Sequence, residues 1–192
     1  MKRILFLGLV VIVAVSLWSA AYGTDNGKAT GRVITGSAQA ITKAALPNIA
    51  DRSVDFDGNG TIDYQILTRI LVTKYTGLME GYATGLIQSA EDLATNTARA
   101  FLTGTFWGTV GGSEPGAMTF INTLVTDRSN PALWVITTRA VVVEGSGSGG
   151  LEGISGYGAY TLSGPPNGPF VGDSTWTFRF SNASGTAFLA SP

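Results

Sequence analysis

The sequence predicts an all-β protein with about eight antiparallel strands. Apolar or alternating stretches of strand length recur along residues 30–181, and each is followed by Gly, Pro, Asn or Asp, which favour turns. Helical periodicity is weak, because only Gln39–Leu46 and Ser89–Thr97 are expected to make one or two helical turns. A β-branched run leads into the glycine-rich segment Val141–Tyr160, which suits a tight corner between closely packed strands.

The expected strands follow one another along the chain. They cover Thr30–Ala38, Thr61–Tyr75, Leu78–Ser89, Ala98–Val110, Ala117–Thr126, Ala132–Glu144, Leu151–Leu162 and Ser174–Ser181. The last is the clearest, because Trp176, Phe178 and Phe180 alternate with polar residues and share one face. Both faces of Ala98–Val110 carry aromatic side chains, so this strand is expected to be buried on one side and covered on the other. Pro165–Pro169 is expected to be a loop.

Eight antiparallel strands joined by short turns form either a barrel or a sandwich. A barrel is favoured because closure removes the exposed edges that a secreted sheet must otherwise protect. An eight-stranded barrel has an interior that side chains fill or that holds one small ligand.

The first residues have the pattern of an export signal. Lys2 and Arg3 precede the apolar stretch Ile4–Trp18, and Ala21-Tyr22-Gly23 offers small residues for cleavage before Thr24. We therefore expect a signal peptide at 1–23, a single barrel domain at 24–192, and a secreted, periplasmic or cell-surface protein. The alternative is an uncleaved anchor, since Ile4–Ala21 approaches the length that spans a bilayer. After cleavage no stable membrane span is expected.

The composition excludes several classes of site. The chain has no cysteine, so neither a disulfide nor a lipid anchor on cysteine is available, and stability must come from the core, a metal or assembly. It has no histidine, which excludes a Ser-His-Asp triad and a histidine zinc ligand. A formal net charge of −1 offers no electrostatic footprint for nucleic acid.

One family resemblance rests on the order of three motifs. Ala117-Met-Thr-Phe120 and Trp134-Val-Ile are followed by Glu144-Gly-Ser-Gly-Ser-Gly-Gly-Leu-Glu-Gly-Ile-Ser-Gly156. This order resembles the DUF3224 family over roughly Gly77–Phe180. The resemblance implies an eight-stranded, lipocalin-like barrel similar to those of allene oxide cyclases and dirigent proteins. The family brings no catalytic residues to carry over, and no motif here carries the isomerase or radical-coupling activity of those barrels. The acidic stretch Asp51–Asp63 and the export signal lie outside the typical member.

The stretch Asp55–Asp63 carries the clearest chemistry. Asp55, Asp57, Asn59 and Asp63 place side-chain oxygens at positions 1, 3, 5 and 9 of a loop in which Thr61 offers a backbone carbonyl. Calcium takes six to eight oxygen ligands, and alternate positions of a tight loop can converge on one ion. The spacing resembles the D-x-D-G-N-G-x-x-D calcium loops of dockerins and surface repeats, and it predicts Ca²⁺ as a structural cofactor.

Two features shape the expected calcium loop. Ile66 stands where an EF-hand has a bidentate glutamate, and the flanks have strand patterns, so we expect a strand-loop-strand site with an affinity of about 10⁻⁴–10⁻³ M. The alternative is a plain hairpin with an Asn59-Gly60 type I′ turn and solvated aspartates.

Each of the remaining candidate residues has a functional interpretation and a non-functional one. Glu80 and Glu152 are candidates for acid–base work inside a lumen, or they are solvent-facing strand residues. Four arginines are candidates for binding an anionic ligand, or they lie on the outer face: Arg69, Arg99, Arg139 and Arg179. Six aromatic residues are expected in the core or along a ligand pocket: Phe101, Phe106, Trp107, Trp134, Trp176 and Phe178.

These patterns favour an exported, calcium-stabilised barrel with a binding or structural role and no evident catalytic machinery. Its expected partners are a small apolar ligand in the barrel or further copies of the chain. One alternative is an extracellular assembly subunit in which Thr24–Thr42 acts as a donor strand. Another is an isomerase-like lumen that acts on an apolar small molecule.

Overall fold

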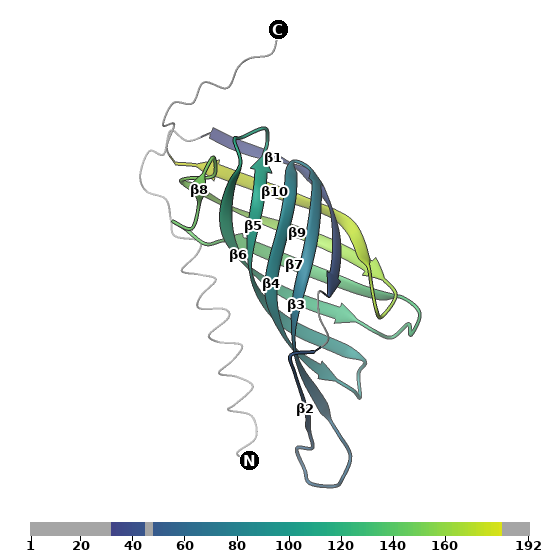
Figure 1. Ribbon diagram of the computed structural model, residues 1–192. Helices are drawn as coiled ribbons and strands as arrows, with labels where there is room; N and C mark the ends of the chain where they lie inside the picture. The colour runs from purple at the N-terminus through teal and green to yellow at the C-terminus, as the bar shows by residue number, and fades with distance from the viewer. Residues whose placement is uncertain (1–31, 45–47, 182–192) are drawn as a thin grey trace. The chain divides into compact units, whose positions relative to one another are not determined.

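The computed structural model describes residues 32–44 and 48–181, and these residues form ten strands of one sheet (Figure 1). The strands are β1 (Arg32–Ala44), β2 (Ala50–Val54), β3 (Tyr64–Gly77), β4 (Met79–Asp92), β5 (Thr97–Val110), β6 (Gly116–Asp127), β7 (Trp134–Val142), β8 (Ser148–Gly149), β9 (Ile154–Gly164) and β10 (Phe170–Phe180). The expected signal peptide at residues 1–23 lies outside the described residues.

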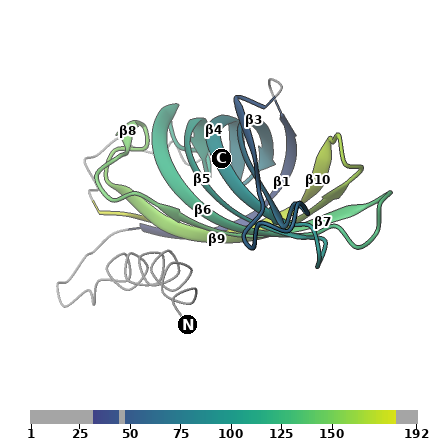
Figure 2. The same cartoon turned by 90° about the horizontal axis from the view of Figure 1, so that it is seen from below.

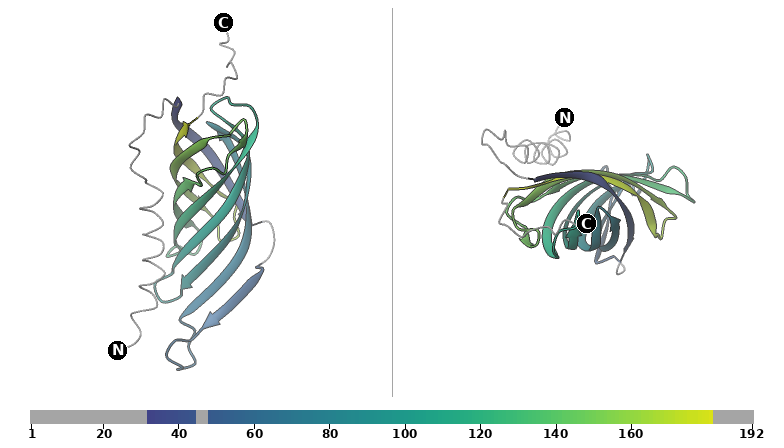
Figure 3. Two further views of the ribbon diagram at one scale, coloured as in Figure 1. Left: turned by 90° about the vertical axis from the view of Figure 1, so that its left-hand side faces the viewer. Right: turned by 90° about the horizontal axis from the view of Figure 1, so that it is seen from above.

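β1 closes the sheet into a barrel because it pairs on both of its sides. It pairs with β10 from Arg32 to Thr42, and residues 38–44 also pair with β3. From β10 the wall continues through β9, β7, β6, β5 and β4 back to β3, and every pairing is antiparallel. The wall curls so that β3 to β6 form one side and β7, β9, β10 and β1 form the other (Figure 2, Figure 3).

The closed eight-stranded antiparallel barrel confirms the predicted fold class. Two short strands lie outside the ring, and neither is among the eight strand ranges expected from the sequence, although the calcium-loop interpretation expected a strand before residue 55: β2 pairs with β3, and β8 pairs with β6. β2 and the loop after it extend beyond one end of the barrel (Figure 1). Residues 32–42 of the expected donor strand form part of the barrel's own wall, between β10 and β3.

Side-chain alternation explains which residues face the interior. In β10, Ser174, Trp176 and Phe178 are buried, while Asp173, Thr175 and Arg179, at alternating positions, are exposed. A strand turns successive side chains to opposite faces, so the period of two in this segment fixes its inner face.

The outer face of β5 differs from the expectation. Leu102 and Phe106 are buried, but Phe101 is 39% exposed and Trp107 49% exposed. The expectation that both faces are covered was therefore wrong among the described residues, because a single-layered barrel leaves the outer face of each strand in solvent.

Both predicted helical turns are strands or turns in the structure. Residues 39–44 belong to β1, and the remainder of Gln39–Leu46 lies outside the described residues. Ser89–Asp92 ends β4, and Asp92 Oδ1 accepts hydrogen bonds from the backbone N–H groups of Ala94 (2.9 Å) and Thr95 (3.1 Å). Asp92 thus closes a turn between two strands instead of lying in a helical turn. The described residues form no helix, and so none that could cross a membrane.

The glycine-rich segment closes one end of the barrel. Residues 143–147 turn the chain after β7, and β8 then pairs with the start of β6 through Gly116↔Gly149 and Ala117↔Ser148. Leu151 and Ile154, which follow, are 0% and 1% exposed and enter the core. The strand expected from Leu151 begins only at Ile154, because Leu151–Gly153 form a turn.

Candidate ligand pocket and metal loop

The interior of the barrel is filled by side chains toward one end. Met79, Val110 and Met118, which come from adjoining ends of β4, β5 and β6, are fully buried there. Trp176 and Phe178 stack with ring centroids 5.4 Å apart, and Trp176 also stacks on Tyr160 at 6.3 Å. This end therefore has no room for a ligand, since its large side chains pack against one another.

The opposite end of the interior contains a cavity of about 470 Å³. Its walls are mainly apolar, with residues from β3 to β7 and β9: Leu71, Ile87, Ala100, Leu102, Phe120, Leu124, Ile136 and Leu162. Small-molecule sites are concave, mostly apolar and about 300–1,000 Å³ in volume, with a few converging polar groups. The cavity has the size and the lining of such a site.

Polar groups converge on the inner part of this cavity. Asn122 Nδ2 donates to Tyr160 Oη at 2.6 Å, and both residues line the cavity. Asn122 Oδ1 is buried without a hydrogen-bond partner among the described residues. Exchanging the Asn122 amide oxygen and nitrogen would still leave one polar atom of the amide unpaired. The buried Asn122–Tyr160 pair is therefore a polar patch in the otherwise apolar inner wall of the cavity.

Burial keeps the two tyrosines of this region neutral. It raises the pKa of Tyr75 well above its ordinary value of 10.0, and it raises the pKa of Tyr160 as well. For Tyr160 the polar neighbours Thr138, Tyr75 and Asn122 offset part of this effect. The phenols therefore offer hydrogen-bonding O–H groups and not phenolate at neutral pH.

An ion cluster lies at the outer part of the cavity. Glu91, at the end of β4, is 5% exposed and accepts a hydrogen bond from Arg128 Nη1, just after β6. Arg69 Nη2 lies 3.9 Å from Glu91 Oε1, and Arg69 Nε donates to Asn48 Oδ1 at 2.6 Å. The Arg128 guanidinium also lies 4.3 Å from the ring centroid of Trp134, in cation–π contact. All five side chains line the cavity, so its polar end is held in place by its own contacts.

The loop at residues 55–63 is ordered by its own aspartates. Asp55 Oδ1 and Oδ2 accept from the N–H groups of Gly58 (2.7 Å) and Gly60 (2.8 Å). Asp63 Oδ2 accepts from Phe56 N–H at 2.8 Å. The hydrogen bond from Gly60 is the main cause that holds the pKa of Asp55 below its ordinary value of 3.8. Asp55 is therefore ionised throughout the neutral range.

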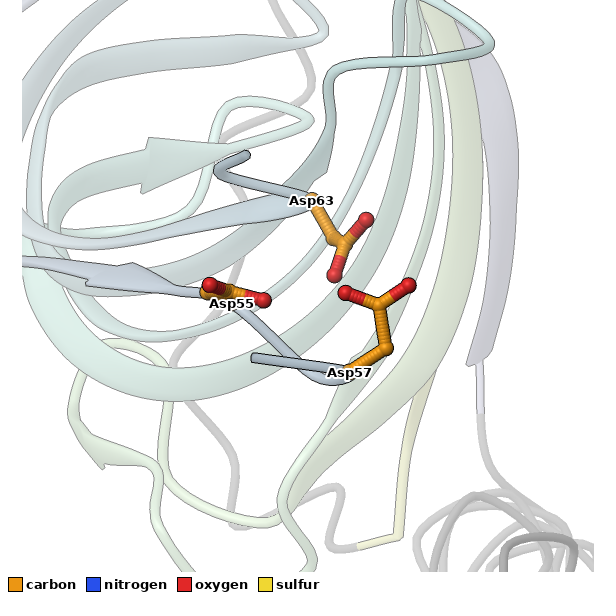
Figure 4. Close-up of side chains that lie close together, drawn as sticks. All are labelled: Asp55, Asp57 and Asp63. Carbon is orange, nitrogen blue, oxygen red and sulfur yellow. The ribbon is translucent and has the colours of Figure 1, made fainter. Parts of the chain in front are cut away.

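The three predicted aspartate ligands come together. One carboxylate oxygen each from Asp55, Asp57 and Asp63 lies within 4.8 Å of the others, and Figure 4 shows the carboxylates of Asp57 and Asp63 facing each other. Asn59 Nδ2 donates to Asp57 Oδ2 at 3.0 Å, and Asn59 Oδ1 accepts from Thr61 N–H at 2.7 Å. Carboxylate oxygens have further lone pairs beyond these bonds, so this donor set fits a hard cation such as Ca²⁺.

The Asn59-Gly60 type I′ turn of the hairpin alternative is not formed, although β2 and β3 are an antiparallel pair. A type I′ turn needs positive φ at both central residues, but in the loop only Gly58 (φ 73°) and Gly60 (φ 85°) have positive φ. β2 and β3 flank the whole stretch 55–63, as the strand-loop-strand interpretation predicted.

The family described as "Protein of unknown function (DUF3224)" matches residues 54–168. The chain belongs to the DUF3224 family. The match begins earlier than the expected Gly77 and spans the aspartate loop, which the sequence resemblance had placed outside the typical member.

A solved structure supports this DUF3224 assignment at the level of the fold. A DUF3224 protein of unknown function from Shewanella oneidensis MR-1 matches with a TM-score of 0.55 and 16% sequence identity. The match covers 79% of this chain and 100% of the other. No curated protein matches the chain.

The DUF3224 barrel separates the four candidate arginines. Arg69 faces the lumen from β3, whereas Arg99, Arg139 and Arg179 are exposed on the outer face. Glu91 and Arg128 were missed by the sequence analysis. Glu91 had been placed in a helical turn, although it continues the inward alternation Ile87, Ser89 along β4.

The other candidates divide in the same way. Glu80 faces outward from β4, and Glu152 lies in the turn before β9, so both are exposed outside the lumen. Trp176, Phe106 and Phe178 are core residues and Trp134 lines the cavity, as expected, while Phe101 and Trp107 lie on the outer face of this DUF3224 barrel. Their alternation in β5 gave no sign of which face is inside, because aromatic side chains occur on both.

Proposed function

We propose that this protein is an exported binding protein whose lumen takes one small, largely apolar molecule, and that Ca²⁺ stabilises the loop at 55–63. The observation that carries the binding role is the cavity of about 470 Å³, with apolar walls and polar groups at both of its ends. Export rests on the signal pattern at residues 1–23, and it implies a secreted, periplasmic or cell-surface location.

Binding is favoured over catalysis by the placement of the acidic residues. The pair proposed for acid–base work, Glu80 and Glu152, lies outside the lumen. The acidic residue that lines the cavity, Glu91, forms a close ion pair with Arg128, so its carboxylate is already engaged by a side chain of the barrel.

A neutral fluorescent probe will test the lumen. We expect N-phenyl-1-naphthylamine to bind wild-type protein saturably at one site, measured by its fluorescence increase. Ala100→Phe should weaken this binding at least about tenfold, because Ala100 lines the cavity and the new ring occupies it.

The matched control is Ala159→Phe, which adds the same ring on the exposed outer face of β9. It should bind the probe as wild type does. Absence of saturable binding to wild type, or equal loss in both variants, would refute the lumen site.

Calcium binding to the native loop should stabilise the protein by mass action. With the expected affinity of about 10⁻⁴–10⁻³ M, about 10 mM Ca²⁺ contributes about 1.4–2.7 kcal/mol, or roughly 3–10 °C in melting temperature. Asp57→Ala should abolish this shift between calcium and chelator, because it removes one of the three converging carboxylates.

Asp173→Ala is the control, since it removes an exposed carboxylate from β10, outside the loop. It should keep the full calcium shift. The calcium proposal fails if wild type melts at the same temperature with calcium and with chelator.

A further inference from the structure

The polar end of the cavity carries an excess of positive charge. Among the residues that line it, the charged ones are Arg69, Glu91 and Arg128, so two cations face one anion. Glu91 and Arg128 form the close pair, with side chains 7% and 20% exposed. This pair is neutral as a unit, and Arg69 supplies the uncompensated charge.

Arg69 has hydrogen-bond donors to spare. Its Nε is used by Asn48 at 2.6 Å, which fixes the guanidinium. Its Nη2 lies 3.9 Å from Glu91 Oε1, a distance at which ions attract but no hydrogen bond forms. The N–H groups of its terminal nitrogens therefore have no acceptor at hydrogen-bonding distance among the described residues. A guanidinium in this state matches a carboxylate, which accepts two parallel N–H···O bonds.

The nearest other acids do not neutralise this charge from within the cavity. Asp51 shares Asn48 with Arg69, since Asn48 Nδ2 donates to Asp51 Oδ2 at 3.4 Å, but Asp51 also accepts from Gln65 and does not line the cavity. Asp92 and Asp127 adjoin Glu91 and Arg128 in the chain, but alternation turns them to the outer face, and neither lines the cavity. Each is also held in a turn: Asp92 Oδ1 accepts from Ala94 and Thr95, and Asp127 Oδ1 accepts from Ser129.

We infer that the molecule bound in the lumen is an amphiphile with a single anionic group, such as a carboxylate, which Arg69 holds at the polar end while the apolar body lies against the lumen walls. The inference rests on the proposed binding function and names the ligand class for it. Leu71 lies two residues from Arg69 along β3, Ile87 lies opposite Arg69 on β4, and Leu102 lies opposite Ile87 on β5, so these apolar side chains form the wall that covers the body of the ligand. The anion then pairs with Arg69, as Glu91 pairs with Arg128.

Two ligands of equal chain length, one charged and one neutral, distinguish the contribution of the anionic group to binding from that of the apolar body. Octanoate and octanol are each titrated against bound N-phenyl-1-naphthylamine at neutral pH, and their dissociation constants are derived from probe displacement. We expect Arg69→Gln to weaken octanoate at least about tenfold, as for the loss of a charge-assisted hydrogen bond, and to leave octanol unchanged. Unchanged octanol binding also shows that the variant has an intact lumen.

Arg99→Gln is the matched control, because it removes the same charge from the exposed outer face of β5. This variant should leave the dissociation constants of both octanoate and octanol unchanged. The inference is overturned if octanol displaces the probe but octanoate does not, or if Arg69→Gln leaves octanoate binding unchanged or weakens both ligands equally. In those cases the lumen site stands. If neither ligand nor the probe binds wild type, the proposed function itself fails.

Discussion

Trp176→Ala should lower the free energy of unfolding by about 3–5 kcal/mol, the loss expected for deleting a fully buried tryptophan. Trp176 is 1% exposed and stacks on Phe178 and Tyr160, and it meets Tyr75 edge-on at 6.4 Å. Its Nε1 donates to Ser174 Oγ at 2.9 Å, and that hydroxyl donates to the Ala38 carbonyl at 2.7 Å. The alanine variant loses the packing and this donor together. Urea unfolding with an unchanged m-value measures the loss.

Trp107→Ala makes the same chemical change on the outside of the barrel. Trp107 is 49% exposed, so its removal should cost about 1 kcal/mol or less. Trp176→Phe retains an aromatic ring but lacks the N–H, and should fall between the two. Similar losses for Trp176→Ala and Trp107→Ala would contradict the assignment of Trp176 to the inner face and Trp107 to the outer face of the barrel.

The strands of the barrel could be predicted because their signal is local. In β10 a period of two runs through Trp176, Phe178 and Phe180, and turn-forming residues follow each of the eight ring strands. β2 and β8 could not be found in this way. β2 (ADRSV) carries little apolar alternation, and β8 has only two residues, so their pairing partners and not their own sequences define them.

The aspartate loop and the ion cluster of the cavity also differ in how local their sequence signal is. The aspartates of the loop at 55–63 lie within nine residues of one another, so their spacing alone indicates that they converge. The ion cluster joins residues 37 positions apart, Glu91 and Arg128, and adds Arg69 from another strand. Only the register of β3, β4 and β6 brings these three together, and no short motif records it.

A substitution in the glycine-rich segment should also lower the stability of the protein strongly. In Gly150→Ala the new Cβ would lie 1.9 Å from the Glu114 carbonyl oxygen and 2.4 Å from its carbon. Real atoms do not approach this closely, so the backbone just after β8 must move away from the segment just before β6. Gly150 N–H also donates to the Pro115 carbonyl at 3.0 Å, and the movement that the alanine variant requires would disturb this bond. We expect a loss of about 3 kcal/mol, the upper part of the range for overpacking, measured by urea unfolding.

Gly145→Ala separates this clash from the cost of glycine conformation. Gly145 has a φ of 74°, and a Cβ there meets no atom within 4 Å. Its replacement should therefore cost only the strain of a left-handed residue, about 1 kcal/mol. If both variants lost the same stability, the close contact between Gly150 and the Glu114 backbone would not be the reason for glycine at position 150. The larger loss for Gly150 would instead explain why this segment of the DUF3224 barrel is rich in glycine: its backbone is packed directly against the backbone of a neighbouring strand.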